Sequence, residues 1–258
     1  MATDRGRPAQ PSHNQSHKQA QATNGGKTRQ DGSSDLYGIP MTQMTDLAPY
    51  LEAELLNPSL SLETIQQFCL EADRFRYAAV CIHPWDLPSV KEWLYQRHPQ
   101  IAVAIGFPLG LQPTLVKLFE AQWATDQGAT ELDVVINAKM VNTQQWDPLY
   151  QEVAGLVEAT HLPVKAILDM GLIDPANLET AVDVCLQSGV SFLKGASSGV
   201  ASVAHVRTLA RLSQGKVGIK ASGGIKTATQ VYDLLEAGAT RIGTTYGQDI
   251  LSQWQTMA

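Results

Sequence analysis

The sequence has little of what marks membrane, secreted or nucleic-acid-binding proteins. None of its apolar runs approaches the ~20 residues that span a bilayer. The polar N-terminus lacks the apolar segment of a signal peptide. Lys and Arg number 19 against 25 Asp and Glu, a formal net charge of −6, so a basic surface for nucleic acid is not expected. These absences predict a soluble, cytoplasmic protein that binds neither a membrane nor a nucleic acid.

Cysteine is scarce as well. The chain has three cysteines, an odd number, and they are widely spaced: Cys69, Cys81 and Cys185. There is no Cys-x-x-Cys pair and no Cys/His cluster with the spacing of metal ligands. This pattern is typical of reduced thiols in a cytosolic protein. We therefore expect no disulfide, no bound metal and no cofactor.

Large apolar side chains are nearly missing from the first part of the chain. Residues 5–34 are rich in Gln, Asn, Ser, Gly, Lys and His, and such a segment cannot bury enough apolar surface to offset the entropy of ordering. We predict a disordered polar tail over residues 1–44 and one folded domain over residues 45–258. The tail is interpreted as a solvated extension, with a tether for a partner as the alternative.

Beyond residue 47, short apolar segments alternate with segments of helical period. Eight segments are predicted as strands: Ala53–Asn57, Ala78–Ile82, Ile101–Phe107, Glu131–Asn137, Pro163–Asp169, Phe192–Ser197, Lys216–Ser222 and Arg241–Thr245. The helices between them include Leu62–Phe75, Thr114–Gln127 and Pro175–Ser188. Strict alternation predicts an α/β protein with a parallel sheet. Eight units in one domain favour a closed (β/α)8 TIM barrel, and the Gly-x-Gly-x-x-Gly fingerprint of a dinucleotide-binding sheet is missing.

Four consecutive predicted strands each carry a charged residue in an apolar run. These residues are Asp133, Lys165, Lys194 and Lys220. Lysine is almost never fully buried without a partner, because an isolated buried ammonium costs several kcal/mol. In a barrel, all four side chains could point into the mouth at the carboxyl ends of the strands, where barrel enzymes place their chemistry.

The ratio of these charges suggests a chemical role. A single Lys–Asp pair would be explained by an ion pair that only stabilises the barrel. Three lysines against one aspartate leave positive charge unpaired, which predicts that one lysine is kept neutral by nearby ammonium groups and by desolvation. A neutral lysine forms Schiff bases with carbonyl groups, and another lysine and the aspartate can then transfer protons.

Glycine and hydroxyl residues follow the last three predicted strands. They lie in the segments Ser197–Gly199, Ala221–Thr227 and Gly243–Gly247. Barrels commonly bind phosphate with the loops after strands seven and eight, through backbone N–H groups. We therefore predict a phosphate site and weigh it against ordinary turn glycines. Its residues are Gly199, Gly223, Gly224, Gly243 and Thr245.

Five segments, in this order, resemble the deoxyribose-phosphate aldolase family: Ala78–Cys81, Val103–Gly110, Glu131–Asn137, Val164–Leu168 and Gly218–Ile225. The resemblance implies a metal-free class I aldolase that reversibly cleaves 2-deoxy-D-ribose 5-phosphate to D-glyceraldehyde 3-phosphate and acetaldehyde. It implies that Lys194 forms the Schiff base and that Asp133 and Lys220 donate and accept protons. It also implies that Lys165 supports them electrostatically.

Three stretches depart from the family's pattern. The family's first strand usually begins Asp-His-Thr-Leu, and we match it to Asn57–Leu60. The segment that usually reads Lys-Thr-Ser-Thr-Gly is one residue longer here, at Lys194–Gly199, and Tyr246 stands where serine or arginine is commoner. Two alternatives therefore stay open. One is an aldolase-like binding or scaffold protein with weakened catalysis, and the other is a related lysine aldolase or transaldolase for another sugar phosphate. As partners we expect the phosphorylated sugar and, at most, a second copy of the chain.

Overall fold

A computed structural model describes residues 46–196 and 199–257 of the chain. The predicted polar tail over residues 1–44 lies outside the described residues, so it stays a prediction. Across the described ranges, no helix has both the length and the apolar character that a bilayer span requires.

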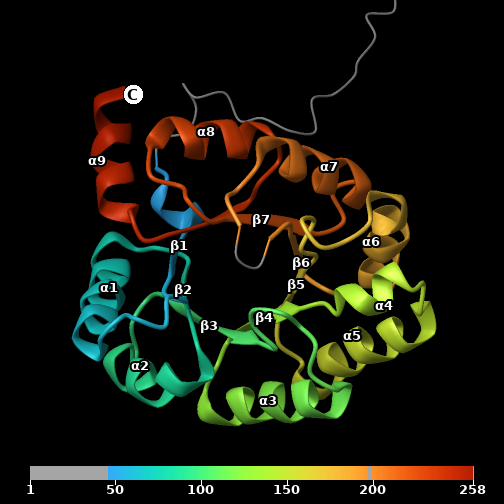
Figure 1. Cartoon of the computed structure of the whole chain (residues 1–258). Helices are drawn as coiled ribbons and strands as arrows, with labels where there is room; N and C mark the ends of the chain where they lie inside the picture. Colours follow the sequence, from blue (N-terminus) through green and yellow to red (C-terminus); the bar gives the residue numbers. More distant parts are fainter. Residues whose placement is uncertain (1–45, 197–198, 258) are drawn as a thin grey trace, which may run out of the picture. The chain divides into compact units, whose positions relative to one another are not determined.

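Eight parallel strands close into a barrel, and each strand pairs with the next one along the chain (Figure 1). The strands are β1 (Leu51–Glu54), β2 (Ala79–Ile82), β3 (Gln100–Ile105), β4 (Glu131–Val135), β5 (Val164–Ile167), β6 (Phe192–Lys194), β7 (Gly218–Ser222) and β8 (Arg241–Thr244). The pairing of β8 with β1 closes the sheet. The predicted (β/α)8 TIM barrel is confirmed.

Helices follow the strands and surround the barrel on its outside (Figure 1). They are α1 (Leu62–Phe75), α2 (Leu87–Trp93), α3 (Thr114–Gln127), α4 (Ala138–Asn142), α5 (Trp146–Thr160), α6 (Leu178–Gln187), α7 (Val203–Ser213), α8 (Ala228–Glu236) and α9 (Gly247–Met257). Single 3-10 turns occur at η2 (Ala48–Tyr50), η3 (Pro84–Asp86) and η4 (Pro175–Asn177). The predicted bounds of α1 and α3 are confirmed, whereas the predicted helix Pro175–Ser188 begins as the 3-10 turn η4 and continues as α6.

Local signals explain where several helices begin and end. Ser61 caps α1, because its side chain accepts a hydrogen bond from the backbone N–H of Thr64. Thr227 and Gln230 form a reciprocal capping box at the start of α8. At the end of α3, Gly128 has a φ of 108°, a left-handed conformation that glycine adopts without steric cost.

The two faces of the barrel strands lie in two different environments. Side chains alternate along each strand, so residues such as Leu132, Leu193 and Ile219 belong to the large apolar core that also contains buried helix residues. A smaller apolar cluster of Cys81, Ala102 and Ala104 comes from β2 and β3. These residues are in register with the strands that carry charge, since Ala104 pairs with Asp133 and Cys81 pairs with Glu54. The interior is thus small and apolar at β2 and β3 and charged on the other strands.

The first strand differs from its prediction. It was expected at Ala53–Asn57, but β1 spans Leu51–Glu54. Its sequence Leu-Glu-Ala-Glu alternates apolar and polar residues, a pattern that usually indicates a strand with one face in solvent. Here Glu52 is fully buried and Glu54 is half-buried, because the polar face points into the barrel. The prediction failed because a buried charged face has the same pattern as an exposed one.

Candidate active site

The strand register brings the four predicted charged residues together. Asp133 pairs with Lys165 across β4 and β5, and Lys194 pairs with Lys220 across β6 and β7. All four residues are fully buried. Asp133 receives hydrogen bonds from Lys165 Nζ at 2.7 Å and from Lys220 Nζ at 2.6 Å. Lys194 Nζ lies 3.7 Å from the same carboxylate, so one aspartate is within ion-pair distance of all three lysines.

Four further charged residues share this interior, and sequence reasoning did not include them in the site. They are Glu52, Glu54, Glu131 and Arg241. Glu131 and Arg241 are the first residues of β4 and β8. Glu52 is the second residue of β1, and Glu54 lies two residues after it on the same face of the strand. Residues two apart in a strand share a face, so the position of Glu131 two residues before Asp133 was a signal in the sequence that both face the interior.

These residues overturn the expected excess of positive charge. The barrel interior holds four cations and four carboxylates among the described residues: Lys165, Lys194, Lys220 and Arg241 against Glu52, Glu54, Glu131 and Asp133. The expectation of three lysines against one aspartate was wrong. An unpaired surplus of ammonium groups therefore does not explain how a lysine here becomes nucleophilic.

A dense ion network occupies the amino ends of the strands. Glu131 contacts Lys165 at 2.6 Å and Arg241 at 3.2 Å. Arg241 also reaches Glu52 at 3.0 Å, and its guanidinium lies 5.3 Å from the centre of the Phe192 ring. Glu52 in turn contacts Lys220 Nζ directly. Each charge has several partners, as a buried ion requires if its desolvation is to be offset.

Electrostatics keep this network ionised. Burial raises the pKa of the Asp133 and Glu52 carboxyls, but the ammonium groups of Lys165 and Lys220 outweigh it, leaving the pKa of Asp133 well below its usual range and that of Glu52 at about 2. Burial lowers the pKa of Lys165 and Lys220, but Asp133 and neighbouring carboxylates outweigh it and raise both. Lys220 is thus an ammonium at neutral pH, suited to donating rather than accepting a proton.

Lys194 has different surroundings. It ends β6, and its Nζ donates a hydrogen bond of 2.8 Å to Glu54 Oε1, at the end of β1. The second oxygen, Glu54 Oε2, is buried without a hydrogen-bond partner among the described residues, although Lys220 Nζ lies 3.5 Å away. The predicted Schiff-base lysine therefore has one short carboxylate contact.

A cavity of about 400 Å³ opens beside Glu54, within the size range of small-molecule sites. It is lined by Glu54, Leu56, Asn57, Pro58, Phe107, Pro108, Gly223, Gly224, Ile225, Gly243, Thr244, Thr245 and Tyr246. Four of the five predicted phosphate residues are in this lining. The fifth, Gly199, lies directly behind it, because its carbonyl oxygen occupies the space that a Cβ on Gly223 would need.

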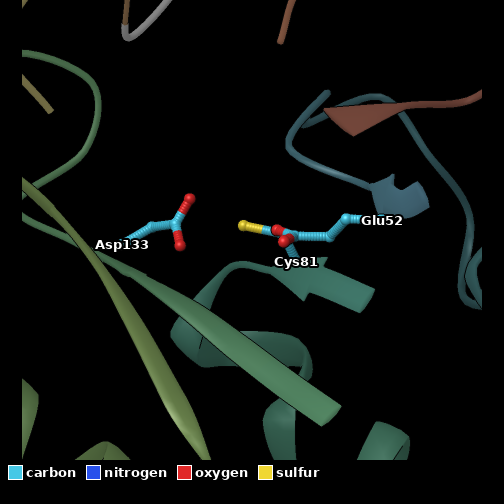
Figure 2. Close-up of side chains that lie close together, drawn as sticks. All are labelled: Glu52, Cys81 and Asp133. Atoms are coloured by element: carbon cyan, nitrogen blue, oxygen red, sulfur yellow. The ribbon is translucent and has the colours of Figure 1, made fainter. Parts of the chain in front are cut away.

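Three potential metal ligands also meet inside the barrel. Glu52, Cys81 and Asp133 point toward one another in Figure 2, and their ligand atoms lie within 4.8 Å of one another. Lys165 and Lys220 already contact the two carboxylates. Burial and the charge of Asp133 raise the pKa of the Cys81 thiol well above its ordinary value, which disfavours the thiolate that binds metals. The group fits an ion-pair network better than a metal, and the absence of a metal stays a prediction.

The bounds of β1 also correct the match to the family's Asp-His-Thr-Leu pattern. The first strand and the next residue contain Glu52-Ala53-Glu54-Leu55, which begins with an acid and ends with leucine as the family pattern does. The earlier match to Asn57–Leu60 was wrong. With the pattern placed on β1, Glu52 occupies its acidic first position and Glu54 its third position, where the pattern has threonine.

Curated relatives cover most of the chain. A deoxyribose-phosphate aldolase of Cyanothece sp. is 44% identical over 214 residues, which is 82% of this chain and 94% of the relative. A deoxyribose-phosphate aldolase of Thermococcus kodakarensis is 34% identical over 80% of this chain and 96% of its own length. A search against protein-family models found no match.

Solved structures that the chain resembles are also aldolases. A tetrameric deoxyribose phosphate aldolase from Aeropyrum pernix superposes with a TM-score of 0.76 and 29% identity, covering 82% of this chain and 92% of that one. An aldolase named QR15 gives a TM-score of 0.77 at 29% identity, covering 83% and 97%.

Proposed function

The chain belongs to the deoxyribose-phosphate aldolase family and is a lyase of the aldolase type, and we propose that the barrel interior around Lys194 is its active site. The reaction is the reversible cleavage of 2-deoxy-D-ribose 5-phosphate to D-glyceraldehyde 3-phosphate and acetaldehyde. The observation that carries the proposal is the buried Lys194 at the carboxyl end of β6, 3.7 Å from Asp133 and 2.8 Å from Glu54, which lines a cavity of about 400 Å³.

The arrangement supports a Schiff-base mechanism. The Lys194 amine adds to the C1 aldehyde of the substrate, and loss of water leaves an iminium ion. The iminium accepts the electron pair of the C2–C3 bond as that bond breaks, while the C3 hydroxyl loses its proton and becomes the aldehyde of the released triose phosphate. Protonation of the enamine at C2 and hydrolysis then release acetaldehyde.

Asp133 and Lys220 transfer the protons of the carbon–carbon step. They are joined by a 2.6 Å hydrogen bond, and both lie within the cluster around Lys194. Because Lys220 is an ammonium and Asp133 a carboxylate, the pair can donate a proton at one atom and accept one at another. Lys165 Nζ donates a hydrogen bond of 2.7 Å to the other oxygen of Asp133, Oδ1, and so helps to hold the carboxylate in place.

The glycine loops suit the substrate's phosphate. Gly223 and Gly224 have φ values of 100° and 68°, so both adopt the left-handed conformation and carry no side chain toward the cavity. The loop leads into α8, where side chains already accept hydrogen bonds from the N–H groups of Lys226, Thr227, Ala228 and Gln230, so the helix contributes the positive end of its dipole to this side of the cavity. Lys226 adds a positive charge, and its Nζ lies 5.1 Å from the centre of the Tyr246 ring. Tyr246, which lines the cavity, thus has a cation beside its ring.

The two alternatives are less well supported. A binding or scaffold protein with weakened catalysis would have no need for Asp133, Lys194 and Lys220, yet all three are present and in contact. Nothing in the described residues favours another sugar phosphate or a transaldolase reaction.

We also propose a cytoplasmic location. The three cysteines are unpaired and buried, as in proteins of a reducing compartment. Assembly into a homodimer stays a prediction.

Borohydride reduction in the presence of acetaldehyde tests the active site. Reduction converts the imine to a stable secondary amine, and peptide mapping by mass spectrometry should place the added ethyl group on Lys194. Cleavage of 2-deoxy-D-ribose 5-phosphate is measured in parallel. A label on Lys165 or Lys220 would show that the nucleophile is misassigned, and a protein with neither label nor cleavage would contradict the proposed function.

A further inference from the structure

Glu54 has no place in the mechanism above, yet it makes the shortest contact of Lys194 with any carboxylate among the described residues. Its Oε1 is 2.8 Å from Lys194 Nζ, whereas Asp133 Oδ2 is 3.7 Å away. Glu54 comes from the end of β1, and Lys194 from the end of β6, 140 residues further along the chain. Where the family pattern has threonine, this chain places an ionisable group directly on the proposed nucleophile.

Asp133 is already engaged elsewhere. One of its oxygens is 2.7 Å from Lys165 and the other is 2.6 Å from Lys220. Both Asp133 oxygens therefore already accept a short hydrogen bond from another lysine, and neither is within hydrogen-bond distance of Lys194 Nζ, which lies 3.7 Å away. Glu54 has one ammonium group at hydrogen-bond distance, Lys194 at 2.8 Å, while Lys220 lies 3.5 Å from its Oε2, which has no hydrogen-bond partner among the described residues. Of the two carboxylates near Lys194, Glu54 is therefore the better acceptor for its proton.

Glu54 also faces the space that the substrate would occupy. Its side chain is 14% exposed, against 1% for Lys194, and it lines the cavity, whereas Lys194 is absent from the described lining. An aldehyde entering the cavity would thus meet Glu54 together with the nitrogen behind it. A group that contacts both the nucleophile and the cavity can act on the nitrogen and on the substrate oxygen.

Gly243 provides the room for this carboxylate. A Cβ at position 243 would overlap Glu54 Oε2 and would also crowd Ser222 Cβ at 2.8 Å. The sequence assigned Gly243 to the phosphate site, but in the structure its missing side chain also accommodates Glu54.

We propose that Glu54 is a catalytic residue for imine formation and imine hydrolysis at Lys194, an inference that rests on the proposed aldolase function. The Glu54 carboxylate takes one proton from the Lys194 ammonium, giving a carboxylic acid and a neutral amine. The amine nitrogen bonds to C1 of the aldehyde, and a proton moves from this nitrogen to the former carbonyl oxygen. The Glu54 acid then protonates the resulting hydroxyl, the C–O bond breaks, and water leaves with that bonding pair. The products are an iminium ion, water and the regenerated carboxylate.

The net change is that an ammonium and an aldehyde become an iminium and water, so charge and atoms balance and no other reactant is needed. The same steps in reverse hydrolyse the iminium and release acetaldehyde. Glu54 thus acts on carbon–nitrogen bonds, while Asp133 and Lys220 act on the carbon–carbon bond. The site divides its proton transfers between two carboxylates.

Rapid-quench borohydride trapping with acetaldehyde tests this division. Glu54→Gln keeps the shape of the side chain but removes the base, and it should slow formation of the trapped adduct by about 10²–10⁴-fold, the usual contribution of a general acid or base. Glu63→Gln is the matched control, because Glu63 is an exposed glutamate in the first turn of α1, and it should trap at the wild-type rate.

Deuterium incorporation gives a second readout that a merely structural role would not change. In D₂O the enamine takes up a deuteron at its terminal carbon each time it returns to the iminium ion. Acetaldehyde that stays bound as the iminium therefore exchanges its methyl protons for deuterons. If Glu54→Gln slows release but not exchange, acetaldehyde should leave with three deuterons from its first appearance, as seen by mass spectrometry. Asp133→Asn should do the opposite and release singly deuterated acetaldehyde at early times.

Chemical rescue covers the case in which Glu54→Gln folds poorly. Glu54→Ala leaves a space beside Lys194, and added formate should restore adduct formation in a concentration-dependent way. Trapping by Glu54→Gln at the wild-type rate or faster, or a failure of formate to restore trapping by folded Glu54→Ala, would overturn the role of Glu54. In that case wild-type trapping and cleavage would still support the proposed function, whereas their absence would overturn both.

Discussion

The two ends of the barrel interior carry the same kinds of residue in different arrangements. At the amino ends of the strands, Glu131 and Arg241 are each held by two oppositely charged groups. At the carboxyl ends, Glu54 and Lys194 make one short contact of 2.8 Å with each other beside a cavity, and their other ion contacts are longer, at 3.5 Å from Glu54 to Lys220 and 3.7 Å from Lys194 to Asp133. Burial alone does not separate the two ends, since charged residues are buried at both. The number of short contacts that each charge makes and the access to the cavity separate them.

The difference separates stability from reactivity. A charge with several partners is held in one state, because moving its proton would break every contact at once. A charge with one close partner can exchange a proton with that partner at the loss of a single interaction. We therefore expect substitutions at the carboxyl ends to affect activity and those at the amino ends to affect stability.

The largest expected effect is that of Lys194→Arg. A guanidinium keeps the positive charge beside Glu54 but stays protonated and forms no imine, so both adduct trapping and cleavage should be lost. The midpoint of thermal unfolding should change by only a few degrees. Measurable cleavage by the purified variant, free of wild-type protein, would contradict the role of Lys194.

Asp133→Asn comes next, because Asp133 belongs to both ends. The amide still accepts a hydrogen bond but transfers no proton, so turnover should fall by about 10²–10⁴-fold, while Lys194 remains trappable. Steady-state cleavage assays and borohydride trapping on the same sample separate the two effects. Equal loss of trapping and turnover would argue against a role confined to the carbon–carbon step.

Glu131→Gln should reverse the pattern. The substitution removes the negative charge that Glu131 presents to Lys165 and Arg241 at the amino ends. It should lower the free energy of unfolding by about 3 kcal/mol, the lower end of the range for removing one partner of a buried pair. The folded variant should keep a kcat within a few-fold of wild type. Urea denaturation and kinetics check both statements, and a large drop in kcat with unchanged stability would contradict the comparison.

The dependence of stability on pH is the smallest expected effect. The pKa values of Asp133 and Glu52 are lowered by folding, so their contribution is complete above their ordinary values of 3.8 and 4.5. The contribution of Glu52 is lost as pH falls toward about 2, and that of Asp133 persists to lower pH. The pKa values of Lys165 and Lys220 are raised, so their contribution is complete below 10.5 and is lost at higher pH. Denaturation midpoints should therefore show a broad plateau, and Glu52→Gln should flatten the acid side.

Much of the architecture could be predicted because local patterns carry it. The seven strands with near-continuous apolar runs were recognised, and α1 and α3 were placed to the residue by their caps and periodicity. The exception was β1, whose two glutamates give it the pattern of a half-exposed strand. The pairing of β1 with β2 and β8 sets which face of the strand points into the barrel, and no local signal in the sequence carries that information.

The candidate site was predictable in part for a similar reason. Lys194 and Lys220 stood out because a lysine interrupts an apolar strand. Glu54 did not stand out, since its partner Lys194 is 140 residues away and only the strand register brings the two together. The charge balance was misjudged because three carboxylates at strand ends look exposed in the sequence, where a residue's neighbours across the barrel are not visible.

The strand register has a further consequence, for insertions and deletions. Because side chains alternate from one face of a strand to the other, losing a single residue before Lys165 would turn it outward and send Ala166 or Val164 into the interior. The same holds for each strand that contributes a charge. The loops between the strands can change in length without this penalty. The spacing within β4 to β8 is thus less tolerant of length variation than the chemical identity of most residues around it.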